Sequence, residues 1–480
     1  LAADLIPGTP REDLRALGYL GAAPIYHKDA RLSQEVIETL ATDDWDERVD
    51  AVTRGLLGLT VACARCHDHK FDPISTRDYY GLAGVFASTQ GVLRPVRADM
   101  DPAVENRFLW VEQRLIHLDY LAKLLTGEPG TKPEEARQKA ARFRAEIQTL
   151  KEEMAALGDR YPEIRQYVAR FGNDTPRQRG AGMASDEPFI QAVYEAGLWI
   201  DGSDPDLTLM DYRPDTPREL PVFLRGSVAS PGPPAPRRFL SILSKGDPGL
   251  GAGSGRLALA RRMFADAAPL AARVMVNRVW GWHFGKPLVA TTSDFGSQGE
   301  RPSHPELLDD LAARWVDNGW SLKWLHREIV LSAAYRQSSR KRAEAAAKDP
   351  TNRWLWRMNP RRLDIEAYRD SLLRAARRLD LRAGGVSADL DEVANQRRTV
   401  YARISRGRLN PLLRLYDFAD PAQHSPGRDL TTTPLQQLFV MNSMFIEEQA
   451  AALAGQVGAL EDAGDKVRTL YRDVFSRDPQ

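Results

Sequence analysis

Both cysteines of this 480-residue chain lie in one stretch, Gly58-Leu59-Thr60-Val61-Ala62-Cys63-Ala64-Arg65-Cys66-His67-Asp68-His69-Lys70-Phe71-Asp72-Pro73-Ile74. Their spacing is Cys-x-x-Cys-His, which two cysteines placed at random would rarely produce. Apolar residues run directly into the cysteines, and a dense apolar and aromatic set follows them. The chain from about Leu32 to Phe86 is therefore predicted to be helical, with Asp43-Asp44 as a helix cap.

The Cys-x-x-Cys-His spacing is typical of covalent attachment of a c-type haem. Two thiols at this separation reach the two vinyl groups of the macrocycle, and a histidine directly after the second thiol turns back onto the iron. We predict that Cys63 and Cys66 are the thioether anchors and that His67 is the proximal iron ligand. The residues expected to bury the macrocycle are Leu57, Leu59, Val61, Phe71, Tyr79 and Phe86.

Three other interpretations of the two cysteines remain open. The first is a structural disulfide between the two cysteines, which an oxidising compartment allows. The second is half of a zinc site in which His67 or His69 joins the two thiolates. The third is a thioredoxin-like redox pair, although no βαβ pattern surrounds the cysteines.

Two residues after the motif are candidates for a supporting role. His69 and Asp72 are predicted to hydrogen-bond a haem propionate or another group around the iron ligand. The alternative is that they cap the helix that follows.

The sixth position of the iron has no ligand within the motif. His69 is tethered to the same turn as His67, so it can hardly reach the opposite face of the macrocycle. Among the distant histidines His283 is the candidate, because Trp280, Trp282 and Phe284 can wall a haem edge. An open or water-filled position is preferred over His283, and it suits redox catalysis because substrate can reach the iron.

The composition is that of a soluble globular protein, with 43% hydrophobic and 27% charged residues. Lys and Arg (66) nearly balance Asp and Glu (65), so no overall charge favours nucleic acid as a partner. No run approaches the roughly 20 apolar residues that cross a bilayer. The length corresponds to two or three domains.

The predicted fold class is mainly α with a small β-rich insert, in a multidomain chain. We place a haem-motif domain at 1–95, a long antiparallel helical hairpin at 96–170, a β-rich insert with a stiff proline-rich linker at 171–250, and a mainly helical domain at 251–480. Two amphipathic stripes, at 108–125 and 140–157, flank a breaker at 126–130 and predict the hairpin. We expect the hairpin to be a spacer or docking arm in which the two apolar stripes pack against each other.

Shorter signals mark the elements on either side of the linker. Alternating residues at 197–200 and 222–225 predict strands of the insert. Pro269 marks the first turn of a helix, and Ser303 and Ser321 are predicted helix caps. One further strand is expected at 400–404.

The stretch 58–74 closely resembles the signature of the planctomycete cytochrome-c-associated domain of unknown function. The C-terminal half is similar to its usual companion, the planctomycete-specific domain of unknown function. The motifs that carry this second resemblance are Ala272-Arg273-Val274-Met275-Val276-Asn277-Arg278-Val279-Trp280, His283-Phe284-Gly285, Asp294-Phe295-Gly296, Ser303-His304-Pro305-Glu306-Leu307-Leu308, Gly319-Trp320-Ser321-Leu322-Lys323, Tyr335-Arg336-Gln337-Ser338-Ser339 and Arg357-Met358-Asn359-Pro360-Arg361-Arg362.

The resemblance implies a secreted or periplasmic haem-associated protein, and members of the family often carry a separate cytochrome domain. The sequence does not identify the redox partner, for which a separate cytochrome domain is the candidate. The chain begins at Leu1 without a signal peptide, and we expect it to be truncated within the first family domain. The predicted function is electron transfer or haem-dependent redox chemistry outside the cytoplasm. The alternative is a non-haem protein that binds extracellular polymers or processes polysaccharides. No pair of catalytic carboxylates stands out, so an enzymatic activity is left open.

Overall fold

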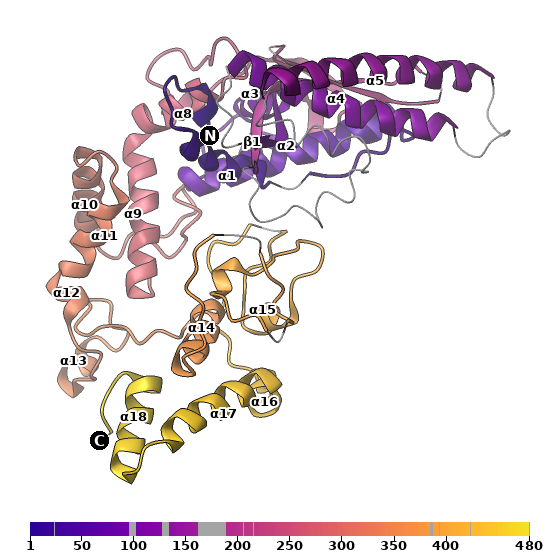
Figure 1. Ribbon diagram of the computed structural model, residues 1–480. Helices are drawn as coiled ribbons and strands as arrows, with labels where there is room; N and C mark the ends of the chain where they lie inside the picture. Colours follow the sequence, from indigo (N-terminus) through magenta and orange to yellow (C-terminus); the bar gives the residue numbers. More distant parts are fainter. Residues whose placement is uncertain are drawn as a thin grey trace. The chain divides into compact units, whose positions relative to one another are not determined.

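The computed structural model describes residues 1–23, 25–95, 102–126, 134–161, 189–204, 206–214, 216–384, 387–392, 394–422 and 424–479. Within these residues the chain is mainly helical and carries two small antiparallel sheets, which confirms the predicted fold class (Figure 1). The described residues form two units, one that ends at Ser332 and one that begins at Ala333. Residues 127–130 of the predicted breaker at 126–130 and the predicted boundary at residue 170 lie outside the described residues.

The cysteine stretch lies between two helices of the first unit. Helix α2 (Gln34–Leu56) begins after Ser33, whose hydroxyl accepts a hydrogen bond from the Val36 amide at 3.4 Å. A 3-10 turn, η3 (Val61–Arg65), carries the first cysteine, and α3 (Thr76–Ala87) follows behind a Ser75–Asp78 capping box. The helical prediction for 32–86 is thus right for two segments and wrong for the irregular stretch between them.

Helix α2 has a different start and end from those that the sequence suggested. Asp43 and Asp44 lie inside the helix and do not cap it. The helix ends before Gly58, which has a φ of +59°. Glycine adopts this left-handed conformation without the penalty that a side chain would add, so it is a natural end for the helix.

Three strands form the first sheet in the order β1-β2-β3, all antiparallel: β1 (Thr89–Pro95), β2 (Phe189–Asp201) and β3 (Leu209–Pro214). Strand β1 lies before the predicted insert. The second sheet pairs β4 (Leu220–Phe223) with β5 (Pro231–Ala235). Strand β5 replaces the predicted stiff linker: its prolines give up ladder hydrogen bonds, which a two-stranded sheet tolerates at its edges.

The predicted helical hairpin is present as α4 (Pro102–Thr126) and α5 (Glu134–Arg160), which lie side by side in Figure 1. Arg107 pairs with Glu153 at 2.7 Å, and Arg114 pairs with Glu146 at 2.9 Å, as antiparallel helices require. The hairpin is not a free arm. Its apolar stripes share a core with Val92, Tyr194 and Ala196 of the first sheet, because the sheet also has an apolar face to cover.

The remaining helical segments of the first unit lie before α2 and after β3 in the sequence. Short helical segments open the chain: η1 (Ala3–Leu5), η2 (Arg11–Leu17) and α1 (Gly18–Gly21). After the sheets come η4 (Leu224–Gly226), η5 (Ser241–Leu243), α8 (Arg256–Ala265), α9 (Ala268–Phe284), α10 (Pro305–Asp317) and α11 (Leu322–Leu331). Pro269 stands in the first turn of α9 and Ser321 caps α11, as predicted, whereas the N-cap of α10 is His304 and not Ser303.

The second unit consists of helices and irregular segments. Its helices are α12 (Ala333–Arg336), α13 (Ala343–Lys348), α14 (Ile365–Ala375), α15 (Pro411–Leu415), α16 (Pro434–Asn442), α17 (Met444–Gly458) and α18 (Ala463–Phe475). The strand expected at 400–404 was wrong: a 3-10 turn, η6 (Thr399–Tyr401), occupies this place. In the part of the chain that the structure describes, no helix is long and apolar enough to cross a membrane.

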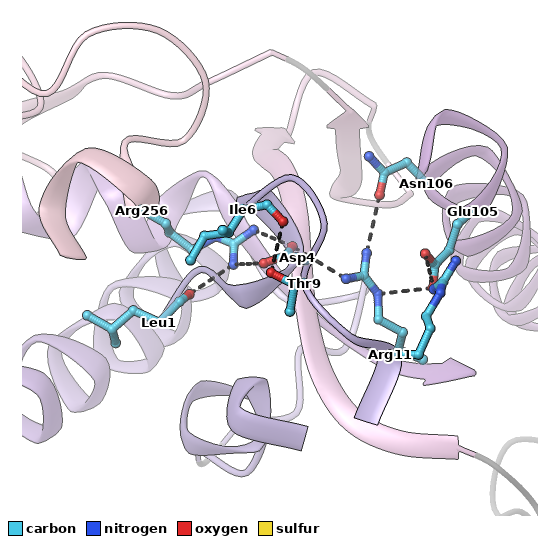
Figure 2. A network of polar contacts seen from close by, with 9 residues as sticks. Leu1, Asp4, Ile6, Thr9, Arg11, Glu105, Asn106 and Arg256 are labelled. Carbon is cyan, nitrogen blue, oxygen red and sulfur yellow. Dashed lines mark hydrogen bonds and ion pairs between the residues drawn. The ribbon is translucent and has the colours of Figure 1, made fainter. Parts of the chain in front are cut away.

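A buried network of charges ties the start of the chain to α8 (Figure 2). The guanidinium of Arg256 is fully buried and donates to both carboxylate oxygens of Asp4, at 2.9 and 2.8 Å, and to the carbonyl of Leu1. Arg94 lies 3.6 Å from Asp4 and 3.4 Å from Glu105, which also pairs with Arg11 at 2.7 Å. Buried charges are tolerated when they are paired in this way. The network therefore joins the N-terminal segment, β1, α4 and α8 within one unit.

Candidate functional site

The two predicted thioether anchors lie on one tight turn at the surface. Cys63 belongs to η3, and its amide donates to the Thr60 carbonyl at 3.1 Å. Cys66 follows the turn directly. Both cysteines are free and solvent-exposed, so both thiols are accessible to a reagent or a cofactor.

His67 is exposed beside the two thiols, and its ring has a defined orientation. Its Nδ1 lies 2.7 Å from the carbonyl oxygen of Asp68. A carbonyl only accepts hydrogen bonds, so Nδ1 must carry the proton. With the proton on Nδ1, the lone pair of a neutral imidazole is on Nε2, which is the arrangement that metal-ligating histidines use.

His69 has the opposite arrangement. Its Nδ1 accepts hydrogen bonds from the backbone amides of Phe71 and Asp72, at 3.3 and 2.8 Å. Its Nε2 therefore carries the proton and donates to the hydroxyl of Thr60 at 3.0 Å. Both ring nitrogens are engaged and the side chain is 5% exposed, so His69 holds the loop together and offers no lone pair to a metal.

The acidic residues of the stretch have structural partners. Asp68 accepts from the amide of Thr76 at 2.8 Å, in the first turn of α3. Asp72 accepts from the amide of Ser297 at 2.7 Å. The alternative that His69 and Asp72 cap the following helix does not describe these contacts, because α3 is capped by Ser75 and Asp78 and is reached by Asp68.

Polar side chains of α2 and α3 support the turn. Arg65 pairs with Asp43 at 2.8 Å, and the hydroxyl of Tyr79 donates to Asp46 at 2.5 Å. The hydroxyl of Tyr80 donates to the Arg65 carbonyl at 3.0 Å. Burial raises the pKa of Tyr80 to about 12 and also raises the pKa of Asp46. The tyrosine hydroxyls therefore stay protonated at neutral pH and keep donating to the turn.

The apolar residues expected to bury a macrocycle have another role. Five of them belong to the buried core of the first unit: Leu57, Leu59, Val61, Tyr79 and Phe86. Phe71, by contrast, is 51% exposed. The prediction of a haem pocket built from these residues is wrong for the five, because the protein's own helices already cover them. A group held by the thiols would lie on the surface.

The tip of the β4–β5 hairpin adjoins the second thiol. Gly226 has a φ of +77°, and a Cβ placed on it would lie 2.7 Å from the sulfur of Cys66. Neighbouring Leu224 is 51% exposed. The sequence offered no signal for this contact, since Gly226 is 160 residues away from Cys66. The hairpin forms one border of the thiol surface.

His283, the candidate sixth ligand, lies close to another histidine. Its Nε2 is 2.7 Å from Nδ1 of His326 on α11, with the two rings nearly perpendicular. Trp280 stacks on Phe284 at 4.1 Å, and both are buried, so these two rings belong to the core around α9 and do not form an open haem wall. Among the described residues, no three His, Cys, Asp or Glu side chains are grouped so as to hold a metal ion.

Two parts of the chain match models of known protein families, and the first part contains the cysteine stretch. Residues 1–91 match PSCyt2, described as a protein of unknown function (DUF1549), and residues 255–480 match PSD1, described as a protein of unknown function (DUF1553). The two matches have the order that the motifs predicted, which confirms the resemblance. No curated protein and no solved structure matches the chain.

Proposed function

Because this chain carries a PSCyt2 region followed by a PSD1 region, with the Cys-x-x-Cys-His turn in the first, we propose that it is a c-type haem protein of the periplasm or the extracellular space. Cys63 and Cys66 are the thioether anchors in this proposal, and His67 is the proximal ligand. When bound, the haem supplies a one-electron redox couple.

One observation carries the proposal: the hydrogen bond from His67 to the Asp68 carbonyl. It fixes the tautomer that exposes the Nε2 lone pair beside two free thiols. Ligating histidines are commonly held by a backbone carbonyl on the other nitrogen, and the Asp68 carbonyl holds His67 in this way. The contrast with His69, only two residues away, makes His67 the residue suited to bind iron.

The surface position of the turn bears on the kind of redox chemistry. Since the nearby apolar residues are used in the core, an attached haem would keep an exposed edge. An exposed edge suits electron exchange with a second protein, and we propose a separate cytochrome domain as that partner. The nearby Phe71 and Leu224, each 51% exposed, provide apolar area for such a contact.

The alternative of a non-haem polymer-binding or polysaccharide-processing protein with structural cysteines receives less support. Structural cysteines are usually buried or paired, and these two are neither. We therefore retain the haem proposal.

The proposal is tested with protein expressed alongside a cytochrome c maturation system. We expect a haem-stained band at the chain's mass on a denaturing gel, and a pyridine haemochrome spectrum typical of two thioether bonds. The variant in which Cys63→Ala is combined with Cys66→Ala should give no band. A wild-type chain that stays unstained while a positive-control cytochrome matures would refute the haem proposal.

A further inference from the structure

The contacts around the cysteine turn form a closed ring that includes a segment more than 200 residues away in sequence. We infer that the segment Phe295–Ser297 of the PSD1 region is a positioning element of the cysteine turn in the PSCyt2 region. Neither family region then builds the site alone. The consequence for haem attachment rests on the proposed function, but the positioning itself does not.

The first contact lies before the cysteines. The amide of Phe295 donates to the carbonyl of Gly58 at 2.7 Å. A Cβ on Gly58 would lie 2.9 Å from the Phe295 ring and 3.0 Å from Val274, and the φ of +59° disfavours a side chain as well. Glycine at 58 is thus needed both to end α2 and to let Phe295 approach the backbone.

The second contact lies after the cysteines. The amide of Ser297 donates to Asp72 Oδ1 at 2.7 Å. Gly296 lies directly against the same carboxylate: a Cβ on it would overlap Asp72 Oδ2. Because Gly296 has an ordinary φ, close approach to Asp72, not backbone conformation, is what requires glycine here.

His69 closes the ring. It accepts from the Asp72 amide on one side and donates to Thr60 on the other, so it joins the two flanks of the turn. The cysteines and His67 lie between Thr60 and His69. Both ends of the turn are therefore held, at one end through Gly58 and at the other through Asp72, by the same three residues of the PSD1 region.

The positioning segment is itself held firmly. Gly296 donates to Asp294 Oδ1 at 2.9 Å, and the Thr291 hydroxyl donates to the Asp294 carbonyl at 2.7 Å. The stretch before it is fixed to α9, since the side chain of the buried Asn277 both accepts from and donates to the backbone of Val289, at 2.8 and 2.9 Å. Helix α9 thus anchors the segment that holds the turn.

The direct test is Gly296→Ala in the full chain without haem. The added methyl group displaces Asp72 and removes the Ser297 hydrogen bond. We expect the amides of His69, Asp72 and Ile74 to exchange with deuterium about tenfold faster, because the loop that they close opens more often. Unchanged exchange at these amides in a folded Gly296→Ala chain would overturn the inference.

Matched variants separate the loss of the Asp72 contact from a general effect of adding a methyl group to the chain. Gly407→Ala adds the same methyl group into open space at an ordinary φ and should leave the exchange unchanged. Asp72→Asn keeps an oxygen that can accept from Ser297 and should remain close to wild type, whereas Asp72→Ala should match Gly296→Ala. Combining Asp72→Ala with Gly296→Ala should add no further acceleration, because the overlap disappears with the carboxylate; additive effects would contradict the ring of contacts.

Haem yield gives the second readout, and it separates the two claims. If the proposed function is right, Gly296→Ala should lower the covalently bound haem per chain several-fold and Gly407→Ala should not. A wild-type chain without haem, together with faster exchange in Gly296→Ala, would refute the haem proposal and leave the positioning role intact. Normal haem yield with unchanged exchange in Gly296→Ala would refute the positioning role and leave the haem proposal intact.

Discussion

His67 and His69 are two residues apart and have opposite proton positions. A carbonyl accepts from Nδ1 of His67, and two amides donate to Nδ1 of His69. The sequence predicted His67 as the ligand from its place after Cys66. It could not predict how His69 is used, because the amides that bind it come from a loop that folds back on the histidine.

A pair of substitutions distinguishes the two histidines. If the proposed haem is attached, His67→Gln should remove the imidazole signature of the ferric haem in optical and paramagnetic resonance spectra, since glutamine lacks the aromatic nitrogen lone pair. His69→Gln should keep that signature but destabilise the chain by about 1–3 kcal/mol, because buried polar groups lose partners. If His69→Gln removes the signature and His67→Gln keeps it, the ligand has been misassigned.

At the scale of elements, periodicity predicted the helices better than the irregular segments. The stripes of α4 and α5 follow the helical repeat and were recognised directly. The break at Gly58 was missed because the apolar run continues through it, and both its left-handed φ and the approach of Phe295 that require glycine there belong to the folded chain. Strand β5 was missed because its prolines suit a linker equally well, and its pairing with β4 is a non-local contact.

The helical hairpin should respond to acid through His117 of α4. Burial lowers the pKa of His117 from 6.5 to about 4, so the folded chain binds this proton less readily than the unfolded chain. The contribution of the neutral ring to stability is complete above pH 6.5 and is lost as the pH falls toward 4. The loss amounts to at most about 3 kcal/mol.

Urea unfolding between pH 7 and pH 4 measures this effect. His117→Leu should reduce the change in the free energy of unfolding between pH 7 and pH 4 by up to about 3 kcal/mol, because leucine has no proton to gain. His27→Gln, which changes an exposed histidine, is the control and should follow the wild-type curve. Parallel curves for His117→Leu and wild type would show that His117 does not govern the acid response.

At the scale of the whole chain, long-range contacts join parts that the sequence analysis assigned to different domains. The predicted boundaries at 95, 170 and 250 remain predictions, yet Arg256 reaches Asp4, and Ser297 reaches Asp72, within the first unit. The motif Asp294-Phe295-Gly296 is one of those that carry the family resemblance. Its place beside the cysteine turn could not be predicted, because nothing in a single sequence indicates which distant loop packs on which.

The charge network makes a prediction at this scale. Arg256→Met leaves the buried carboxylate of Asp4 without its bidentate partner, and removal of one member of a buried pair costs about 3–5 kcal/mol. Arg261→Met, at an exposed position of the same helix, should change stability by about 0.5 kcal/mol or less. Both are measured by urea unfolding followed by tryptophan fluorescence. Equal effects of the two substitutions would contradict the role of the network.

Covalent haem attachment is decided by the intact mass of the denatured chain after expression with a cytochrome c maturation system. A covalently attached haem survives denaturation, so we expect a gain of one haem mass for each chain. Proteolysis should then place the whole gain on the peptide that contains Cys63 and Cys66. An unmodified mass, obtained while a control cytochrome in the same cells carries its haem, would show that Cys63 and Cys66 do not attach haem.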